Sequence, residues 1–492
     1  MDTDIIETLE TAFHPKSIAV VGASEDPFSF GYHYVRHLLD YGYSGRIYPV
    51  NPSRDSVLGL RAYPSMSSIP GTVNYVICCL PASKVPDLLA ECPAKGAKVV
   101  HLVAGRLSET GRQEAKNLEL EILKAARRFN VRLIGPNCLG VYYPGEGIAH
   151  SYNLPKEPGT IGAVCQSGGV STLLVRYGES RGLHFSKVIS YGNALDLDES
   201  DFLYYLAHDD ETEMVAAYFE GVKDGRKFLR ILGDAARVKP VITVKGGRGV
   251  AGARAVASHT AAIAGSDAIW NAALKKAGVI SARDLSELVD LLVVFSLLPP
   301  IIGDRVGLLS AGGGLSVMSA DACEEAGLVV PPLPDDIKEQ LREKAPEIWD
   351  WVGNPIDCSA IAAGVSMRFT GIAQEMMRMM ARSIHFDLLI AEFSDDNPFQ
   401  EEVWRSVASD QIEALISLSR NSRKPLIAVV SNGIAGCGRF PHQRWDLLAE
   451  QRARLIAARI PTYTTVAEAA KAASKFIRYW RVRAKAQLSS SN

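Results

Sequence analysis

Residues 17–24 read SIAVVGAS, a short β-branched run that passes directly into a turn of small residues. The same arrangement returns as TIGAVCQSGG at residues 160–169 and as RVGLLSAGGG at residues 305–314. Each run is apolar at successive positions, as strands buried on both faces of a parallel sheet are. Because a helical stretch follows each turn, the sequence predicts an α/β chain built from parallel sheets.

The three repeated openings divide the chain into three blocks, which we place at residues 1–150, 151–300 and 301–492. A length of 492 residues agrees with that number at about 150 residues per domain. The first block closes at GPNCLGVYYPGEG, and Pro299-Pro300 ends the last helical stretch of the second. We expect the acidic start MDTDIIETLE and the polar tail QLSSSN to be weakly structured.

The composition excludes several classes of protein. Lys and Arg total 53 and Asp and Glu total 55, so the basic excess typical of nucleic-acid binders is missing. The most apolar stretch, residues 288–303, is short for a membrane span and contains Asp290. The N-terminus is acidic where a signal peptide is basic. We therefore expect a cytoplasmic protein without a membrane or nucleic-acid partner.

The cysteines and histidines give no sign of a metal site. None of the eight cysteines forms a CxxC pair or lies at zinc-ligand spacing, and most lie in apolar stretches. A cysteine there behaves as a small hydrophobic residue. The ten histidines are not clustered either, so we expect no metal ligands in this chain.

Turns of small residues before a helix suit phosphate, because backbone N–H groups and the positive end of the helix dipole face the ligand. Glycine in any single turn can equally serve only to close a tight connection. The dinucleotide fingerprint is absent, since Ser24 and Pro27 follow Gly22 at its second and third positions, and no P-loop occurs. Three such turns in one chain favour a ligand that bears phosphate.

One histidine has an unusual context. His259 lies in SHTAAIAG (residues 258–265), after a glycine- and arginine-bearing stretch and before small residues only. Neutral imidazole is a good nucleophile near pH 7 and can carry a transferred group, provided that a partner fixes its tautomer. Glu220, at the end of a predicted strand, is a candidate partner. The alternative is a loop histidine that caps a helix together with Ser258.

Several longer motifs occur in a fixed order: HPKSIAVVGAS, IYPVNP, GPNCLG, CQSGGV, YFEGVKDGRKF, KGGR…ASHTAAIAG, SAGGGLSVMSADACEEAGL, NPIDCSA and IPTYTTVAEAAKAAS. In these motifs the chain resembles the NDP-forming acyl-CoA synthetases of the ADP-forming acetyl-CoA synthetase type, relatives of succinyl-CoA synthetase, from about Phe13 to Lys475. The resemblance implies a Rossmann-type CoA-binding domain at residues 1–150, then two flavodoxin-like, succinyl-CoA ligase-like domains at 151–300 and 301–492.

The resemblance also implies a reaction. Acyl-CoA, ADP and phosphate are interconverted with a carboxylic acid, ATP and CoA, through an acyl phosphate and a phosphohistidine. His259 would carry the phosphoryl group and Glu220 would stabilise it, while the glycine-rich run at residues 246–252 gives the carrier mobility. The helix N-terminus that holds the phosphate matches Ser167, Gly168 and Gly169.

Further positions follow from the resemblance. Contacts with CoA are expected from turns at strand ends, and the acyl group is expected near the GPNCLG motif. The expected CoA residues are Gly22, Ala23, Ser24, Asn51, Pro52, Arg54, Pro81 and Gly105, and the acyl-site residues are Asn137 and Gly140. Pro81 can equally be a plain turn residue. The chain departs from the family at Arg106-Leu107, where an aromatic residue is usual.

The family also needs an ATP-grasp module, and the three blocks account for the chain without one. We therefore expect an α-type chain whose separate ATP-grasp β-type subunit binds ADP or ATP with Mg²⁺, in a hetero-oligomer. Two alternatives stay open: a CoA-dependent acyl transferase or thioesterase without nucleotide coupling, and a non-catalytic acyl-CoA sensor. The sequence names neither the carboxylic acid nor the choice between ADP and GDP.

Overall fold

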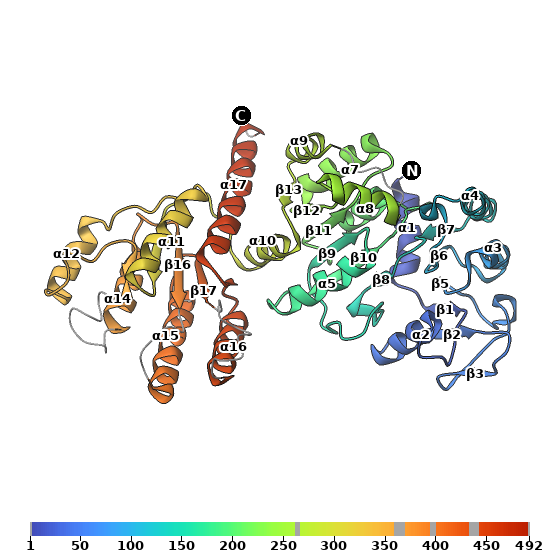
Figure 1. Ribbon diagram of the computed structural model, residues 1–492, viewed down its shortest axis with the longest axis horizontal. Coiled ribbons are helices and arrows are strands. Elements are labelled where there is room, and N and C mark those ends of the chain that lie inside the picture. Colours follow the sequence, from blue (N-terminus) through green and yellow to red (C-terminus); the bar gives the residue numbers. More distant parts are fainter. Residues whose placement is uncertain (1, 261–265, 359–369, 394–399, 432–441, 491–492) are drawn as a thin grey trace. The chain divides into compact units, whose positions relative to one another are not determined.

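The computed structural model describes residues 2–260, 266–358, 370–393, 400–431 and 442–490 (Figure 1). The chain divides into two compact units, Met1–Leu288 and Val289–Asn492. The chain has three larger sheets, two in the first unit and one in the second. Nearly all of their strands are parallel, which confirms the predicted α/β class. The division into three domains at residues 150 and 300 stays a prediction. None of the described helices has the length and apolar character needed to span a membrane.

The first sheet has five parallel strands in the order β2-β1-β5-β6-β7. All five residues of β1 are buried, as expected for a strand covered on both faces. The strands are β1 (Ser17–Val21), β2 (Arg46–Val50), β5 (Tyr75–Cys78), β6 (Val99–Leu102) and β7 (Arg132–Ile134), with the small hairpin β3 (Ser56–Val57) and β4 (Leu60–Arg61) beside them. The helices are α1 (Asp2–Phe13), α2 (Phe30–Asp40), α3 (Val85–Lys95) and α4 (Gln113–Arg128), with short 3₁₀ turns η1 (Met66–Ser68), η2 (Ala82–Lys84), η3 (Ser108–Thr110) and η4 (Pro144–Glu146).

The second sheet has six strands in the order β13-β12-β11-β9-β10-β8. Five are parallel, and the sixth, β8, pairs antiparallel with β10 at one edge. The strands are β8 (Gly140–Tyr142), β9 (Ile161–Cys165), β10 (Phe185–Ser190), β11 (Met214–Phe219), β12 (Val241–Lys245) and β13 (Ile280–Ala282). The helices are α5 (Gly168–Glu179), α6 (Glu199–His208), α7 (Gly225–Val238), α8 (Val250–Thr260) and α9 (Asp267–Ala277). Helix α10 (Leu285–Leu297) follows β13 and contains the boundary between the two units.

The expectation of a weakly structured N-terminus is wrong, because residues 2–13 form helix α1. Ile5, Leu9, Ala12 and Phe13 recur at helical spacing and are all buried, the last three completely. They join one hydrophobic core with residues from both sheets of the first unit, and Phe13 stacks on Tyr205 of α6. Burial of each large side chain stabilises this helix by about 2 kcal/mol.

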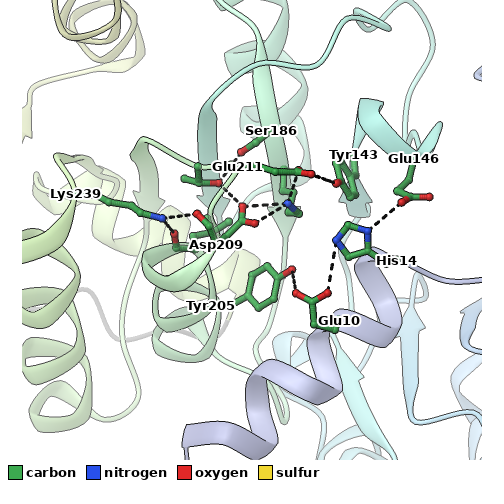
Figure 2. Close-up of polar contacts among 12 residues, drawn as sticks. Glu10, His14, Tyr143, Glu146, Ser186, Tyr205, Asp209, Glu211 and Lys239 are labelled. Carbon is green, nitrogen blue, oxygen red and sulfur yellow. Dashed lines mark hydrogen bonds and ion pairs between the residues drawn. The ribbon is translucent and has the colours of Figure 1, made fainter.

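Polar contacts also hold α1 (Figure 2). The Tyr205 hydroxyl donates to Glu10 Oε1 over 2.7 Å, and His14 Nδ1 lies 3.0 Å from Glu146 Oε1. The ring of His14 meets Tyr143 edge-on, and Tyr143 lies next to a further ion cluster in the second sheet. Helix α1 is therefore fixed by both its apolar and its polar faces.

That ion cluster surrounds a completely buried lysine in β10. Lys187 Nζ donates to Asp209 Oδ1 over 2.9 Å and to Glu211 Oε2 over 2.7 Å, and it lies 4.4 Å from the centre of the Tyr143 ring. Figure 2 shows Asp209 and Glu211 converging there, with Lys239 beside them. A buried charge with several hydrogen-bonded partners is tolerated, whereas an unpaired one is not.

The second unit contains one parallel sheet in the order β15-β14-β16-β17-β18, with its own hydrophobic core. The strands are β14 (Val306–Ser310), β15 (Ile356–Asp357), β16 (Leu388–Phe393), β17 (Leu426–Val430) and β18 (Thr462–Tyr463). The helices are α11 (Gly313–Glu325), α12 (Asp335–Lys344), α14 (Thr370–Arg382), α15 (Glu401–Asn421), α16 (His442–Ala457) and α17 (Val466–Ser490). Because α17 continues to Ser490, the expected weak structure of residues 487–490 is also wrong; residues 491–492 lie outside the described ranges.

Candidate functional site

The predicted phosphate-binding helix begins at the carboxyl end of β9. Ser167 is the N-cap of α5, and its Oγ accepts the Val170 N–H over 3.4 Å. A Cβ on Gly168 would lie 2.7 Å from Leu139, so glycine permits close packing of this turn, while Gly169 is exposed. The first turn of α5 therefore presents free backbone N–H groups at a positive helix end.

Glu220 follows β11, the neighbouring strand, and is almost completely buried. Gln166 Oε1 accepts the backbone N–H of Glu220 over 2.7 Å and that of Gly221 over 3.2 Å. The Tyr218 hydroxyl donates to Glu220 Oε1 over 3.3 Å, and burial together with the Glu220 charge raises the pKa of Tyr218. The turn that carries Glu220 is thus held beside the start of α5.

Lys245 completes this arrangement from the end of β12. Its Nζ donates to the Glu220 carbonyl over 2.7 Å and to the Gly246 carbonyl. Burial lowers the pKa of Lys245, and the nearby Glu220 carboxylate opposes that shift. A Cβ on Gly246 would lie 2.5 Å from the Tyr218 hydroxyl. Sequence reasoning missed Lys245 and Tyr218, because their roles depend on neighbouring strands far apart in the chain.

His259 lies in helix α8, close to its C-terminal end, and not in a loop. Residues such as Ala251, Ala253 and Ala255 favour the helix, which begins at Val250 after most of the glycines of residues 246–252. The expected mobility of this run stays a prediction. Gly247 keeps a left-handed φ of 71° just before α8, so the backbone freedom of glycine is used there. The side chain of His259 and the following residues 261–265 lie outside the described part of the structure.

The first predicted CoA turn is more closed than expected. The N–H groups of Gly22 and Ala23 both donate to the Val50 carbonyl, over 3.0 and 3.2 Å, and are not free for a phosphate. Gly22 has a φ of 87°, and a Cβ on Gly31 would lie only 1.9 Å from the Gly22 carbonyl oxygen. Helix α2 therefore begins directly against this turn, which leaves its first-turn amides to face a ligand. Ser24 Oγ accepts the N–H of Asp26.

The remaining predicted CoA residues line the carboxyl ends of the first sheet. Asn51 links the ends of β2 and β1, because its Nδ2 donates to the Ala23 carbonyl over 2.7 Å. Pro52 and Arg54 follow it and are exposed, and Pro81, also exposed, precedes η2 after β5. Their assignment to CoA stays a prediction.

The predicted acyl-site residues lie where the two sheets of the first unit meet. Asn137 has a left-handed φ of 60°, and Gly140 has a φ of 74° with no room for a side chain beside His101. The loop after β10 runs alongside, since the Asn193 N–H donates to the Pro136 carbonyl over 3.0 Å. The ends of both sheets are therefore brought together in one place.

Gly105, after β6, joins the same group. A Cβ on Gly105 would lie 2.9 Å from Asn137 Oδ1 and 3.1 Å from Glu109 Oε1. Helix α8 lies in contact with η3, which contains Glu109. Glu109 and Asn193 are site residues that sequence reasoning missed, although Glu109 follows the Arg106-Leu107 departure by only two residues.

The third glycine turn, in the second unit, differs from the other two. Carboxylates border it: Ser310 Oγ donates to Glu392 Oε2 over 2.7 Å, and a Cβ on Gly313 would lie 3.0 Å from Asp357 Oδ2. Negative groups at this position disfavour a phosphate. The sequence-based inference that all three turns favour a phosphate-bearing ligand is therefore weaker at the third turn.

Comparisons with known proteins identify two domains in the first unit and several relatives of the chain. Residues 16–144 match the family model of a CoA binding domain, and residues 158–295 match that of the succinyl-CoA ligase like flavodoxin domain. The ADP-forming acetate–CoA ligase I subunit alpha of Pyrococcus furiosus is 36% identical over 365 residues, which are 73% of this chain and 78% of that protein. The ADP-forming acetate–CoA ligase of Methanocaldococcus jannaschii is 35% identical over 70% of this chain, but the match covers only 48% of that protein.

A solved structure extends the likeness to the second unit. The dinucleotide forming acetyl-coenzyme A synthetase 1 of Ca. Korarchaeum cryptofilum, in complex with phosphate and ADP, is 29% identical with a TM-score of 0.80. The match covers 98% of each chain. The similarity in fold therefore extends over nearly the whole length of both chains.

Proposed function

The chain belongs to the ADP-forming acetate–CoA ligase family, and from this membership we propose how its residues carry out the reaction. As an α-type chain, it acts in the interconversion of acyl-CoA, ADP and phosphate with a carboxylic acid, ATP and CoA. Its relatives are named as ligases, so the transferase, thioesterase and sensor alternatives are not favoured.

The phosphoryl group passes through His259. Phosphate first attacks the acyl carbonyl of acyl-CoA, which releases CoA and forms an acyl phosphate; His259 then takes the phosphoryl group and releases the carboxylate. The observation that carries this proposal is the hydrogen bond from the Glu220 N–H to Gln166 Oε1, because it holds a carboxylate beside the N-terminus of α5. Glu220 would fix the imidazole tautomer, and the α5 amides at Ser167, Gly168 and Gly169 would bind the phosphate.

CoA would bind along the carboxyl ends of the first sheet. Its phosphates would meet the N-terminus of α2 next to Ser24, and its adenosine end would lie near Asn51, Pro52 and Arg54. Pro81 and Gly105 border the path toward Asn137 and Gly140, where the thioester would lie. Ligands of open parallel sheets bind at this edge, which supports the assignment. The identity of the acid stays open.

We further propose that an ATP-grasp β-type subunit supplies the binding site for ADP or ATP and Mg²⁺. Two relatives that this chain covers to 78% and 82% of their length are named alpha subunits, which implies a partner. The larger Methanocaldococcus ligase is matched over only about half of its length. In the proposed hetero-oligomer, His259 would deliver its phosphoryl group to the partner's nucleotide.

The test uses the chain purified with an ATP-grasp subunit and ATP labelled at the γ-phosphate. Acid-labile, base-stable label is expected on this chain and is expected to be lost in His259→Ala, while the control His385→Ala, at an exposed position, keeps it. Label that persists in His259→Ala would overturn the carrier role. Full ADP-dependent turnover by the chain alone would overturn the need for a second subunit.

A further inference from the structure

A single carboxylate links the segments of the predicted acyl site. Glu109 Oε1 accepts the backbone N–H groups of Arg106 and Leu107, the latter over 3.0 Å. Its other oxygen, Oε2, accepts Nδ2 of Asn193 over 2.8 Å. Asn193 Oδ1 in turn accepts Nδ2 of Asn137 over 3.4 Å. The chain of contacts runs from the turn after β6, through the loop after β10, to the turn after β7.

The chemistry of the carboxylate fixes the direction of this chain. An ionised carboxylate only accepts hydrogen bonds, so Asn193 must turn its amino group toward Glu109 and its carbonyl oxygen toward Asn137. Asn137 must then offer an N–H to Asn193, and its own Oδ1 lies on the side of Gly105. One amide proton of Asn137 is used in this way, and the second remains to donate to a ligand.

The backbone around these groups is held in unusual conformations. Arg106, Asn137 and Ala194 are non-glycine residues with left-handed φ angles of 69°, 60° and 51°. Each costs of order 1 kcal/mol and persists only where the surroundings impose it. A Cβ on Gly192 would lie 2.2 Å from the Pro136 carbonyl oxygen, so the two loops are packed as closely as glycine allows. Strain of this kind gathers where geometry serves a function.

We propose that Glu109 is a positioning residue for the acyl-transfer step, acting through Asn193 on Asn137. Asn137 would donate its remaining N–H to the acyl oxygen, on which negative charge develops when phosphate attacks the thioester. The inference rests on the proposed function and deepens it, because it assigns the group that orients the acyl-site amide. The chain of contacts ends beside Gly105, and helix α8 contacts η3, the short turn that contains Glu109.

The key variant is Glu109→Gln, which has the same shape. Its Oε1 can still accept from Arg106 and Leu107, but its amino group now faces the amino group of Asn193. Asn193 and then Asn137 must turn over, which presents the wrong group to the acyl oxygen. The kcat for phosphate-dependent acyl-CoA cleavage is expected to fall about 100-fold, as for loss of one oxyanion donor. The KM for ADP is expected to stay unchanged.

The double variant Glu109→Gln with Asn193→Asp exchanges the carboxylate and the amide between positions 109 and 193. The new carboxylate accepts from Gln at 109 and from Asn137, so Asn137 regains its original orientation, and acyl turnover is expected to return to within about tenfold of wild type. Asn193→Asp alone places two carboxylates face to face and is expected to remain impaired. A residue that serves folding alone would show no such rescue.

Two further measurements separate the possible outcomes. Labelling of His259 by ATP through the partner subunit involves no acyl group and is expected to be unchanged in all variants. If Glu109→Gln fails to fold, Asn193→Ser provides the second variant. It removes the side-chain amide at position 193 and leaves the hydrogen bonds of Glu109 to Arg106 and Leu107 in place. The same loss of kcat is expected. Full acyl turnover in a folded Glu109→Gln or Asn193→Ser variant, or no rescue in the folded double variant, would overturn the inference. Absence of acyl turnover and of label in the wild-type assembly would instead overturn the proposed function.

Discussion

Gln166 Oε1 accepts the backbone N–H of Glu220 over 2.7 Å, so the end of β9 holds the turn after β11 in place. Replacement of Gln166 by Met keeps the length of the side chain but leaves two buried N–H groups, those of Glu220 and Gly221, without an acceptor. We expect a loss of about 1–3 kcal/mol in the free energy of unfolding. The label retained on His259 is expected to decay faster, because Glu220 is no longer fixed.

Chemical denaturation and the lifetime of the labelled species check this prediction. Gln340→Met, on the exposed side of α12, is the matched control and is expected to change neither quantity. A Gln166→Met variant with wild-type stability and wild-type label lifetime would contradict the positioning of Glu220 by Gln166.

Gly31→Ala is expected to weaken CoA binding. The added Cβ would lie 1.9 Å from the Gly22 carbonyl oxygen, so α2 must move away from the turn after β1. We expect a destabilisation of about 1–3 kcal/mol and at least a tenfold rise in the Kd for CoA. Isothermal titration with CoA measures the second effect. Gly233→Ala in α7, where a Cβ meets no atom within 4 Å, is the control and is expected to stabilise the protein slightly.

Lys187→Met is expected to destabilise the first unit strongly. Lys187 is completely buried, and its removal leaves the Asp209 carboxylate, which is only 9% exposed, without its cation. Loss of one partner from a buried pair costs about 3–5 kcal/mol. Thermal unfolding measures this, and Arg36→Met, which breaks a surface pair with Asp40, is expected to lower the unfolding temperature far less, because exposed ion pairs contribute little to stability. Equal effects of the two variants would argue against a structural role for the buried cluster.

Glu199 is expected to make stability depend on pH. Burial, and then the charge of Asp198, raise the pKa of Glu199 from 4.5 to about 7, while Lys227 and Lys223 oppose the shift. The folded state holds the extra proton between these pH values, so the contribution to stability is fully present below pH 4.5 and is lost as pH rises through 7. The difference amounts to about 3 kcal/mol.

Glu199→Gln, which is neutral at every pH, is therefore expected to exceed wild type in unfolding free energy at pH 8 and to equal it near pH 4.5. Denaturant titrations at the two pH values make the comparison. Glu213→Gln, at an exposed position, is the control and is expected to follow wild type throughout. A variant that is less stable than wild type at pH 8 would show that the charged form of Glu199 is the stabilising one.

Local sequence signals predicted the strands well, because a run such as Met214–Phe219 is buried on both faces and its apolar pattern needs no knowledge of its neighbours. Helix α1 had an equally local signal in the spacing of Ile5, Leu9 and Phe13, which the acidic residues between them obscured. Helix α8 was missed for the opposite reason, since glycines before His259 outweighed the alanines that follow them.

The site was predictable only in part. Family motifs pointed to Glu220 and Asn137, but the contacts that orient them come from residues 54 and 56 positions away along the chain, Gln166 for Glu220 and Asn193 for Asn137. No periodicity records such pairings. The buried Lys187 illustrates the same limit, because a lysine within a strand gives no local sign of the carboxylates that neutralise it.

The antiparallel strand β8 has a consequence for how this protein can be divided. Residues 140–142 precede the predicted boundary at residue 150, yet they form the outer edge of the second sheet, and α1 adds a core that both sheets share. A truncation at residue 150 would leave β8 on the first fragment without its partner strand β10, and would expose the edge of the second sheet on the other fragment. Recombination among relatives should therefore transfer residues 1–288 as one inheritable block, and the CoA-binding half should not exchange alone.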